Sequence, residues 1–159
     1  MWWIWEASAL ANAWEVSPAG PDQEAAGLVH LGARGTLLNF FLGRRLQFSR
    51  EIPFGGNFFS EAPAEALPSK WEEWLNQCRT SFDFYENQFG QGVKRLVLSG
   101  GGIRMAGFIE WLPGATGLPV ERWNPTSGLV GEIDAKKLED WSSSLGVAVG
   151  LAIRGFAGA

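Results

Sequence analysis

The stretch LSGGGIRMAG, residues 98–107, places three consecutive glycines directly after the apolar run VKRLVL at residues 93–98. A nearly continuous apolar run of this kind is typical of a strand buried on both faces of a sheet. Glycine tolerates positive φ and the close approach of other groups, so Gly100, Gly101 and Gly102 indicate a sharp turn from the strand into a helix. The pattern leaves open whether a nucleotide lies against this backbone or the glycines only permit a tight turn.

The glycine run matches neither of two common phosphate-binding signatures. A dinucleotide fingerprint beginning at Gly100 would need glycine where the chain has Met105. A Walker loop built on Gly102 and Gly107 would need lysine where the chain has Phe108. What remains is a strand, a glycine run and a helix start, whose free N–H groups can accept an anion or the edge of a nucleoside. From these residues alone, a plain strand-to-helix turn is the simpler interpretation.

A second glycine-containing turn, HLGARGT at residues 30–36, joins two β-type runs. Its backbone amides near Gly32 and Ala33, together with the Arg34 and Thr36 side chains, have the chemistry to hold a phosphate. An ordinary hairpin with an exposed Arg34 is the simpler interpretation of these residues taken alone. Both turns are therefore candidate ligand contacts whose local patterns also fit plain turns.

The composition excludes several classes of function. The chain has 159 residues, 46% of them apolar, which predicts one domain over residues 1–159 with a single core. Its net charge of -4 offers no electrostatic footprint for nucleic acid or anionic lipid. His30 is the only histidine and Cys78 the only cysteine, so a zinc site, a histidine-based triad and a disulfide framework all lack parts. We expect neither catalytic nor metal-ligating residues.

The opening MWWIWE is apolar, but it lacks a basic segment and reaches Glu6 after five residues, too early for a signal peptide or a membrane span. We therefore expect a cytoplasmic protein without direct membrane insertion. Nine tryptophans are many for this length, and we expect some of them to line a surface that meets a partner.

Periodicity along the chain predicts an α/β fold, a mixed sheet with helices on its faces. Trp3, Ala7, Leu10 and Trp14 form the stripe of an amphipathic helix within residues 1–16. Three short β-type runs then predict an antiparallel meander. The runs lie at 27–31, 36–42 and 45–52; after them we expect a short helix beginning at Ser60, helices at 69–88 and 105–112, strands at 93–98 and 119–121, and a small-residue helix at 142–156 packed against the sheet.

Five segments, taken in order, resemble the second half of an actin-like ATPase, most closely the PilM family of type IV pilus assembly proteins. GLVHLGARGTLLNFFLGRRLQFSREIPFGG (27–56) resembles the family's second phosphate hairpin and the strands that follow. QCRTSFDFYENQ (77–88) and VKRLVLSGGGIRMAGFIEWL (93–112) resemble the helix before the adenosine motif and the motif itself. GLPVERWNP (117–125) and GVAVGLAIRGF (146–156) resemble the closing strand, the Asn-Pro turn and the final helix.

The resemblance implies an RNase H-like core over residues 27–156, which is the repeated half of the actin-like ATPase fold with its three-stranded antiparallel meander. It implies that ATP and Mg²⁺ are the possible cofactors. The residues that match the family's cofactor contacts are Gly32, Ala33, Arg34 and Thr36 around the phosphates, and Gly100, Gly101 and Gly102, followed by Arg104, against the nucleoside.

Departures from the family pattern argue against ATPase activity. His30 stands in place of a usual aspartate near the metal and the attacking water, Gln77 in place of a glutamate that faces the ribose, and Ala106 in place of a proline. Residues 60–71 leave little room for a subdomain that forms one wall of the adenine cleft. The first half of the actin fold, with its own phosphate loop and the PilN-binding groove, has no counterpart in this sequence, so we expect weak ATP binding or none.

Three functions remain open on these grounds. The first is a PilM-like, truncated or degenerate actin-like scaffold of type IV pilus or related secretion machinery, held beside the inner membrane through PilN-like partners. The second is an ATP-binding half-domain that completes a nucleotide site with a complementary actin-like half on another chain. The third is a self-associating structural module in which exposed tryptophans drive a homodimer.

Overall fold

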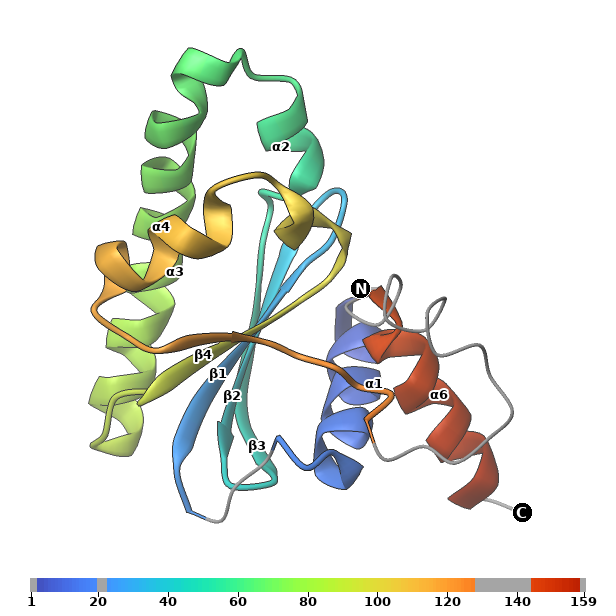
Figure 1. The fold of residues 1–159 in the computed structure, drawn as a ribbon. Helices are drawn as coiled ribbons and strands as arrows, with labels where there is room; N and C mark the ends of the chain where they lie inside the picture. Colours follow the sequence, from blue (N-terminus) through green and yellow to red (C-terminus); the bar gives the residue numbers. More distant parts are fainter. Residues whose placement is uncertain (1–2, 20–22, 128–143, 158–159) are drawn as a thin grey trace.

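The computed structural model describes residues 3–19, 23–127 and 144–157 and contains a five-stranded mixed sheet with helices on both faces (Figure 1). Strand order is β3-β2-β1-β4-β5; β1, β2 and β3 form an antiparallel meander, and β4 and β5 run parallel to β1. The elements are α1 (Trp3–Val16), β1 (Ala25–Leu31), β2 (Thr36–Leu42), β3 (Arg45–Ile52), α2 (Gly56–Ser60), η1 (Ala64–Ala66), α3 (Leu67–Phe89), β4 (Arg95–Ser99), η2 (Gly101–Arg104), α4 (Phe108–Thr116), β5 (Val120–Arg122) and α6 (Gly146–Ala157). The predicted α/β fold and its meander are confirmed.

Helices α3 and α4 cover one face of the sheet, and α1 and α6 cover the other (Figure 1). Successive residues of β2 show how both faces are filled, because side chains alternate along a strand. Phe40 stacks on Tyr85 of α3 with ring centroids 4.9 Å apart, and Phe41 stacks on Trp14 of α1 at 4.7 Å. Burial on both faces explains why β1, β2 and β4 are nearly continuous apolar runs.

Helix α6 packs closely on α1, and its Val147 and Val149 also pack on the core cluster at this face of the sheet, so the predicted packing includes a helix-to-helix contact that the sequence prediction did not name. A Cβ atom at Gly150 would stand 1.7 Å from the carbonyl oxygen of Ala9, so only glycine lets the two helices approach this closely. At Gly146 a Cβ would stand 2.9 Å from both the Leu10 and the Trp123 side chains. The small residues of α6 therefore serve helix-to-helix packing, and this pair forms the second layer over the sheet.

Two helix boundaries differ from the predictions. The helix predicted at 105–112 begins later, at Phe108, and extends to Thr116 as α4, because Gly107 before it has a φ of 82° that is not helical. The preceding short helix η2 ends at Arg104, outside the predicted segment. The short helix predicted to begin at Ser60 instead ends there as α2, and η1 follows after Pro63. The Trp3 side chain, part of the predicted stripe of α1, lies outside what the structure describes.

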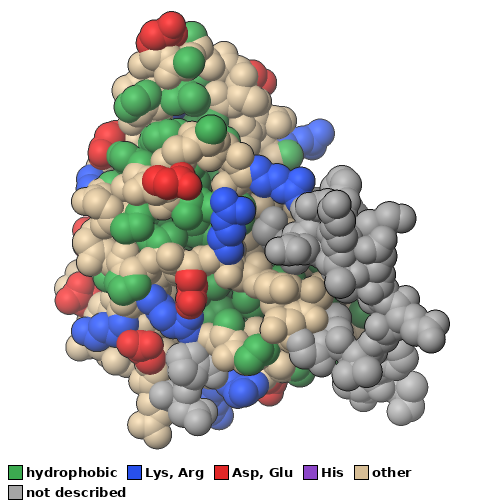
Figure 2. All heavy atoms as spheres, in the orientation of Figure 1, with side chains coloured by type: hydrophobic (Ala, Val, Ile, Leu, Met, Phe, Trp, Pro, Cys, Tyr) green, Lys and Arg blue, Asp and Glu red, His purple; other side chains and the backbone are tan. Residues whose placement is uncertain are grey.

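The surface over α3, α4 and α2 shows apolar side chains with charges of both signs interspersed among them (Figure 2). This face therefore carries no broad basic field. Within the described ranges, no helix has both the length and the apolar character needed to cross a bilayer. Among the six tryptophans whose side chains are described, Trp5 alone is exposed.

Candidate functional site

The corner formed by Gly100, Gly101 and Gly102 is packed against the end of β1. Gly100 has φ of 93°, and a Cβ there would lie 2.3 Å from the carbonyl oxygen of Leu31. A Cβ at Gly102 would lie 2.5 Å from Cγ of Leu31, whereas at Gly101 the nearest atom would be 3.9 Å away. The group that approaches this backbone too closely for a side chain is therefore the protein's own neighbouring strand.

The hairpin at residues 32–35 is held in place by the start of α2. The N–H of Gly32 donates to the carbonyl of Gly35 at 2.9 Å and closes the turn. The N–H groups of Gly56 and Asn57 donate to the carbonyls of Gly32 and Ala33, each at 2.8 Å. These bonds fix the orientation of the hairpin and use two donors that the start of a helix would otherwise offer to an anion.

The two glycine turns meet at one end of the sheet, because β1 and β4 are parallel and both turns follow their carboxyl ends. We call the hollow between them the corner pocket, with a volume of about 430 Å³. Its lining comes from the hairpin tip, α2 and η2, and consists of Ala33, Gly56, Asn57, Ser60, Gly101, Gly102, Arg104 and Met105. Four of the predicted contact residues therefore lie together: Ala33, Gly101, Gly102 and Arg104.

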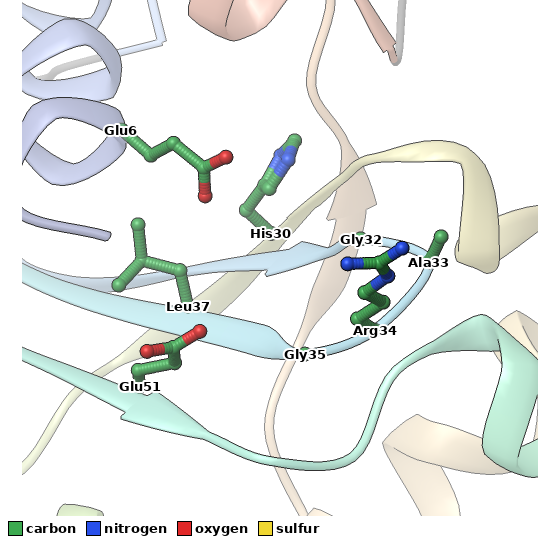
Figure 3. A pocket seen from close by; sticks show the side chains of 8 residues that line it. All are labelled: Glu6, His30, Gly32, Ala33, Arg34, Gly35, Leu37 and Glu51. Carbon is green, nitrogen blue, oxygen red and sulfur yellow. The ribbon is translucent and has the colours of Figure 1, made fainter. Parts of the chain in front are cut away.

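A second hollow, which we call the hairpin pocket, lies on the α1 side of the sheet and has a volume of about 390 Å³ (Figure 3). It contains the predicted contacts Gly32, Ala33 and Arg34, but also two carboxylates that the sequence analysis did not single out. Its lining residues are Glu6, His30, Gly32, Ala33, Arg34, Gly35, Leu37 and Glu51. Glu51 lies opposite Leu37 in the β2–β3 register, so both side chains are on the face towards α1.

His30 adds no positive charge to the hairpin pocket at neutral pH. Burial lowers the pKa of His30 from 6.5 to about 4, because the charged ring would lose its hydration. Its Nδ1 atom lies 2.6 Å from Oγ of Ser99, the residue paired with it across β1 and β4. With His30 neutral, the charged groups of the pocket are the Glu6 and Glu51 carboxylates and the Arg34 guanidinium, so its net charge is negative.

Four residues named from the sequence lie outside both pockets: Thr36, Gly100, Gln77 and Ala106. Thr36 is fully buried on the α3 side, where its hydroxyl donates to the carbonyl of Phe54 at 2.6 Å and accepts from Nε1 of Trp74 at 2.9 Å. That geometry leaves the predicted phosphate contact of Thr36 without support. Gly100 is buried beneath the corner, and Gln77 is exposed on α3.

The two pockets differ in how well their residues suit ATP and Mg²⁺. The corner pocket offers backbone around its glycines and the side chain of Arg104, which suits a nucleoside or a single anionic group. The hairpin pocket opposes a polyphosphate, because Glu6 and Glu51 outnumber Arg34. Nowhere in the described ranges do three histidine, cysteine or acidic side chains gather closely enough to hold a metal ion. In the described part of the chain, the hairpin pocket therefore does not fit a triphosphate, because it lacks the cationic donors that such a group needs.

The fold is that of actin-like proteins. The chain superposes on a protein in the PilM-PilN type IV pilus biogenesis complex with a TM-score of 0.81 and 21% identity, covering 93% of this chain and 51% of that one. It superposes on the ethanolamine utilization protein EutJ from Carboxydothermus hydrogenoformans with a TM-score of 0.56 and 16% identity, and the alignment covers 93% of this chain and 53% of EutJ. The archaeal actin homolog Ta0583 superposes with a TM-score of 0.58 and 13% identity, and the alignment covers 92% of this chain and 53% of that one.

No protein-family model matches the sequence, and no curated protein matches it. The chain spans about half the length of each structure named above. At these identities, the likeness establishes the actin-like fold.

Proposed function

We propose that this chain corresponds to the second, C-terminal half of a PilM-like protein and acts as a scaffold in type IV pilus or related secretion machinery. Its contacts with PilN-like proteins would use a surface of this half, since the PilN-binding groove of the family belongs to the first half. The observation that carries the proposal is the superposition on the PilM-PilN complex, whose TM-score of 0.81 exceeds the 0.56 and 0.58 obtained with EutJ and Ta0583. The same alignment covers 51% of that longer chain, in agreement with a half-length correspondence.

The electrostatics of the hairpin pocket support weak or absent ATP binding. A triphosphate needs several charge-assisted donors around it. Here Arg34 is the one cationic side chain of the pocket, while Glu6 and Glu51 repel an anion and His30 is neutral at pH 7. A scaffold that works through protein contacts does not require the donors that this pocket lacks.

An exposed apolar surface on α1 and α6 supports the role of protein contacts. Ile4 and Trp5 of α1 and Leu151 of α6 are 44%, 59% and 50% exposed, and the Arg154 guanidinium lies 5.6 Å from the centroid of the Trp5 ring. Large apolar side chains gathered on a surface are typical of interaction sites. A homodimer driven by exposed tryptophans is an alternative, and in the described part of the chain it would depend on Trp5. Static light scattering tests it: the wild type should then have the mass of a dimer, and Trp5→Ala the mass of a monomer.

Affinity capture tests the scaffold role. We expect the tagged gene product, expressed in its native cells, to recover PilN-like inner-membrane proteins of a pilus or secretion system. Leu151→Glu should reduce this recovery, because it introduces a charge into the exposed apolar surface. A matched control, Leu46→Glu, places the same charge on an exposed leucine of β3 and should leave recovery unchanged. Recovery of unrelated proteins alone would contradict the proposal.

A nucleotide-binding half-site completed by a partner chain is a second candidate, favoured by the corner pocket. An apolar hollow of about 290 Å³ adjoins that pocket, and the two share Ser60 and Met105. Together they offer an apolar surface for a base next to glycine backbone. Calorimetric titration with Mg-ATP, with and without the partner, decides between the candidates. Submillimolar binding that appears only with the partner, or any hydrolysis of ATP, would favour the nucleotide-binding half-site over a pure scaffold.

A further inference from the structure

Helix α6 is apolar around its whole circumference, and Arg154 is its one charged residue. Gly146 and Gly150 face α1, where a side chain would collide with Leu10 and Ala9. The side turned away from α1 is exposed, although it carries small or apolar residues at intervals of three and four: Ala148, Leu151, Ala152 and Gly155. A helix that is apolar on all sides is normally buried, so we expect a further layer of protein over this side.

The first turn of α1 extends the exposed apolar area. Ile4 and Trp5 are exposed there, and the guanidinium of Arg154 lies over the Trp5 ring, which joins the two helices at this point. We call the combined area the α1–α6 surface; it consists of Ile4, Trp5, Ala148, Leu151, Ala152 and Gly155. It belongs to the helix layer on the opposite face of the sheet from α3 and α4 (Figure 1).

Exposed apolar residues elsewhere do not form a comparable surface. Phe84 and Phe89 of α3 are exposed, but charged residues such as Asp83 and Glu86 stand beside them, as is usual for a helix that faces water. Helix α6 has no charged residue before Arg154. In the described part of the chain, the α1–α6 surface is therefore the apolar area that most resembles an uncovered contact between domains.

The lengths of the similar structures indicate what covers this surface. The three structures named above are about twice as long as this chain, and the matched part of the protein in the PilM-PilN complex is 51% of its length. Under the proposed function this chain corresponds to the second half of such a protein, so the other half precedes the matched part. Because α1 is the first helix of the described chain, the preceding half would join it on the side of the α1–α6 surface.

We propose that the α1–α6 surface binds a complementary actin-like half, the kind of domain that forms the remainder of those longer proteins, whichever polypeptide carries it. The proposal rests on the proposed function and names a partner for its contact surface. Association removes Ile4, Trp5 and Leu151 from water. The small residues of α6 let a helix of the partner approach as closely as α1 does at Gly150. A PilN-like protein that contacts both halves would be lost with the complementary half, in agreement with the reduced recovery expected for Leu151→Glu.

Site-specific photo-cross-linking in the native cells tests which protein covers the surface. The full chain carries p-benzoyl-phenylalanine in place of Leu151, and a matched control carries it in place of Leu46, an exposed leucine of β3. Mass spectrometry identifies the polypeptide in each light-induced adduct. At position 151 we expect a polypeptide whose fold superposes on the part of the PilM chain that this protein leaves unmatched, and at position 46 we expect no such adduct.

Sedimentation of the purified chain with that polypeptide then measures the affinity. Leu151→Glu and Ala152→Glu should each weaken the complex about 10-fold or more, because each places a charge within a buried apolar contact. Leu46→Glu adds the same charge outside the contact and should change the affinity by less than about 2-fold. Equal effects of Leu151→Glu and Leu46→Glu would overturn the inference.

The adducts also separate this inference from the scaffold role. An adduct at position 151 with only a second copy of the chain, or none beyond the control, would overturn the inference. An adduct with only a PilN-like protein would overturn it as well and leave the scaffold role standing. A complementary half at position 151, together with affinity capture that recovers no PilN-like protein, would refute the scaffold role and leave this contact intact.

Discussion

The two glycine turns of this protein lie side by side, but their glycines serve different purposes. At the corner, Gly100 and Gly102 are required because Leu31 of β1 occupies the space that their side chains would take. At the hairpin, a Cβ on Gly32 or Gly35 would meet its nearest neighbour at 3.2 Å, a contact that a small adjustment relieves, and the turn faces two pockets. Glycine-rich sequence after a strand is thus explained by packing, whereas the less glycine-rich hairpin carries the accessible chemistry.

The largest effect expected from this comparison is at Gly100. Gly100→Ala should lower the free energy of unfolding by about 3 kcal/mol or more, because its Cβ would lie 2.3 Å from a strand carbonyl and its φ of 93° disfavours a side chain. Gly101→Ala is the matched control and should change stability by less than about 0.5 kcal/mol. Urea denaturation measures both. If Gly100→Ala and Gly101→Ala lowered stability equally, close packing on Leu31 would not explain why position 100 is glycine.

The next largest effect is a pH dependence of stability that originates at His30. Its pKa is about 4 in the folded protein and 6.5 when unfolded, so above pH 6.5 both states are neutral and the group has no effect. As pH falls from 6.5 towards 4, the unfolded chain takes up the proton first, and up to about 3 kcal/mol of stability is lost. His30→Gln should flatten urea-denaturation stability between pH 6.5 and 5. An unchanged slope in that variant would exclude His30 as its source.

The periodic parts of the fold were predictable from the sequence, and the parts set by distant contacts were not. The first two strands of the meander follow from their apolar runs, and β3 from its alternation of apolar and polar residues. The position of α2 does not, because its start is set by hydrogen bonds from Gly56 and Asn57 to the hairpin, and these depend on the folded arrangement. The break between η2 and α4 has a local signal in Gly107, which the apolar spacing of the following residues obscured.

The candidate site was predicted in outline, and its charges were missed. The family resemblance named Ala33, Gly101 and Gly102, and these three residues line one pocket; their contact with a cofactor stays a prediction. Glu6 and Glu51 were overlooked because they are far apart in the sequence and each reads as an ordinary surface charge. The strand register contains the missing signal, since Glu51 pairs with Leu37 on the α1 face.

A smaller loss of stability is expected at Thr36, and it tests whether this side of the hairpin is packed against the protein or open to a ligand. Thr36→Val should lower the free energy of unfolding by about 1–2 kcal/mol, because it leaves the buried Trp74 Nε1 and the Phe54 carbonyl without their partner. Thr36→Ser keeps the hydroxyl, so its loss should be smaller. Thermal and urea denaturation of the pair measure the difference. If valine is as stable as serine, the hydroxyl is not a structural group and its assignment to a ligand regains weight.

The smallest effect is expected at Arg34, on the open side of the same hairpin. Its side chain is exposed and forms no ion pair or hydrogen bond in the described part of the chain, so Arg34→Ala should change the free energy of unfolding by less than about 0.5 kcal/mol. Urea denaturation of Arg34→Ala and Gly101→Ala under the same conditions measures this change in the free energy of unfolding. A stable Arg34→Ala protein with altered ligand affinity would mean that the arginine acts on what enters the pocket. A loss above 1 kcal/mol would instead place Arg34 in the packing of the hairpin, and the contrast between the two turns would disappear.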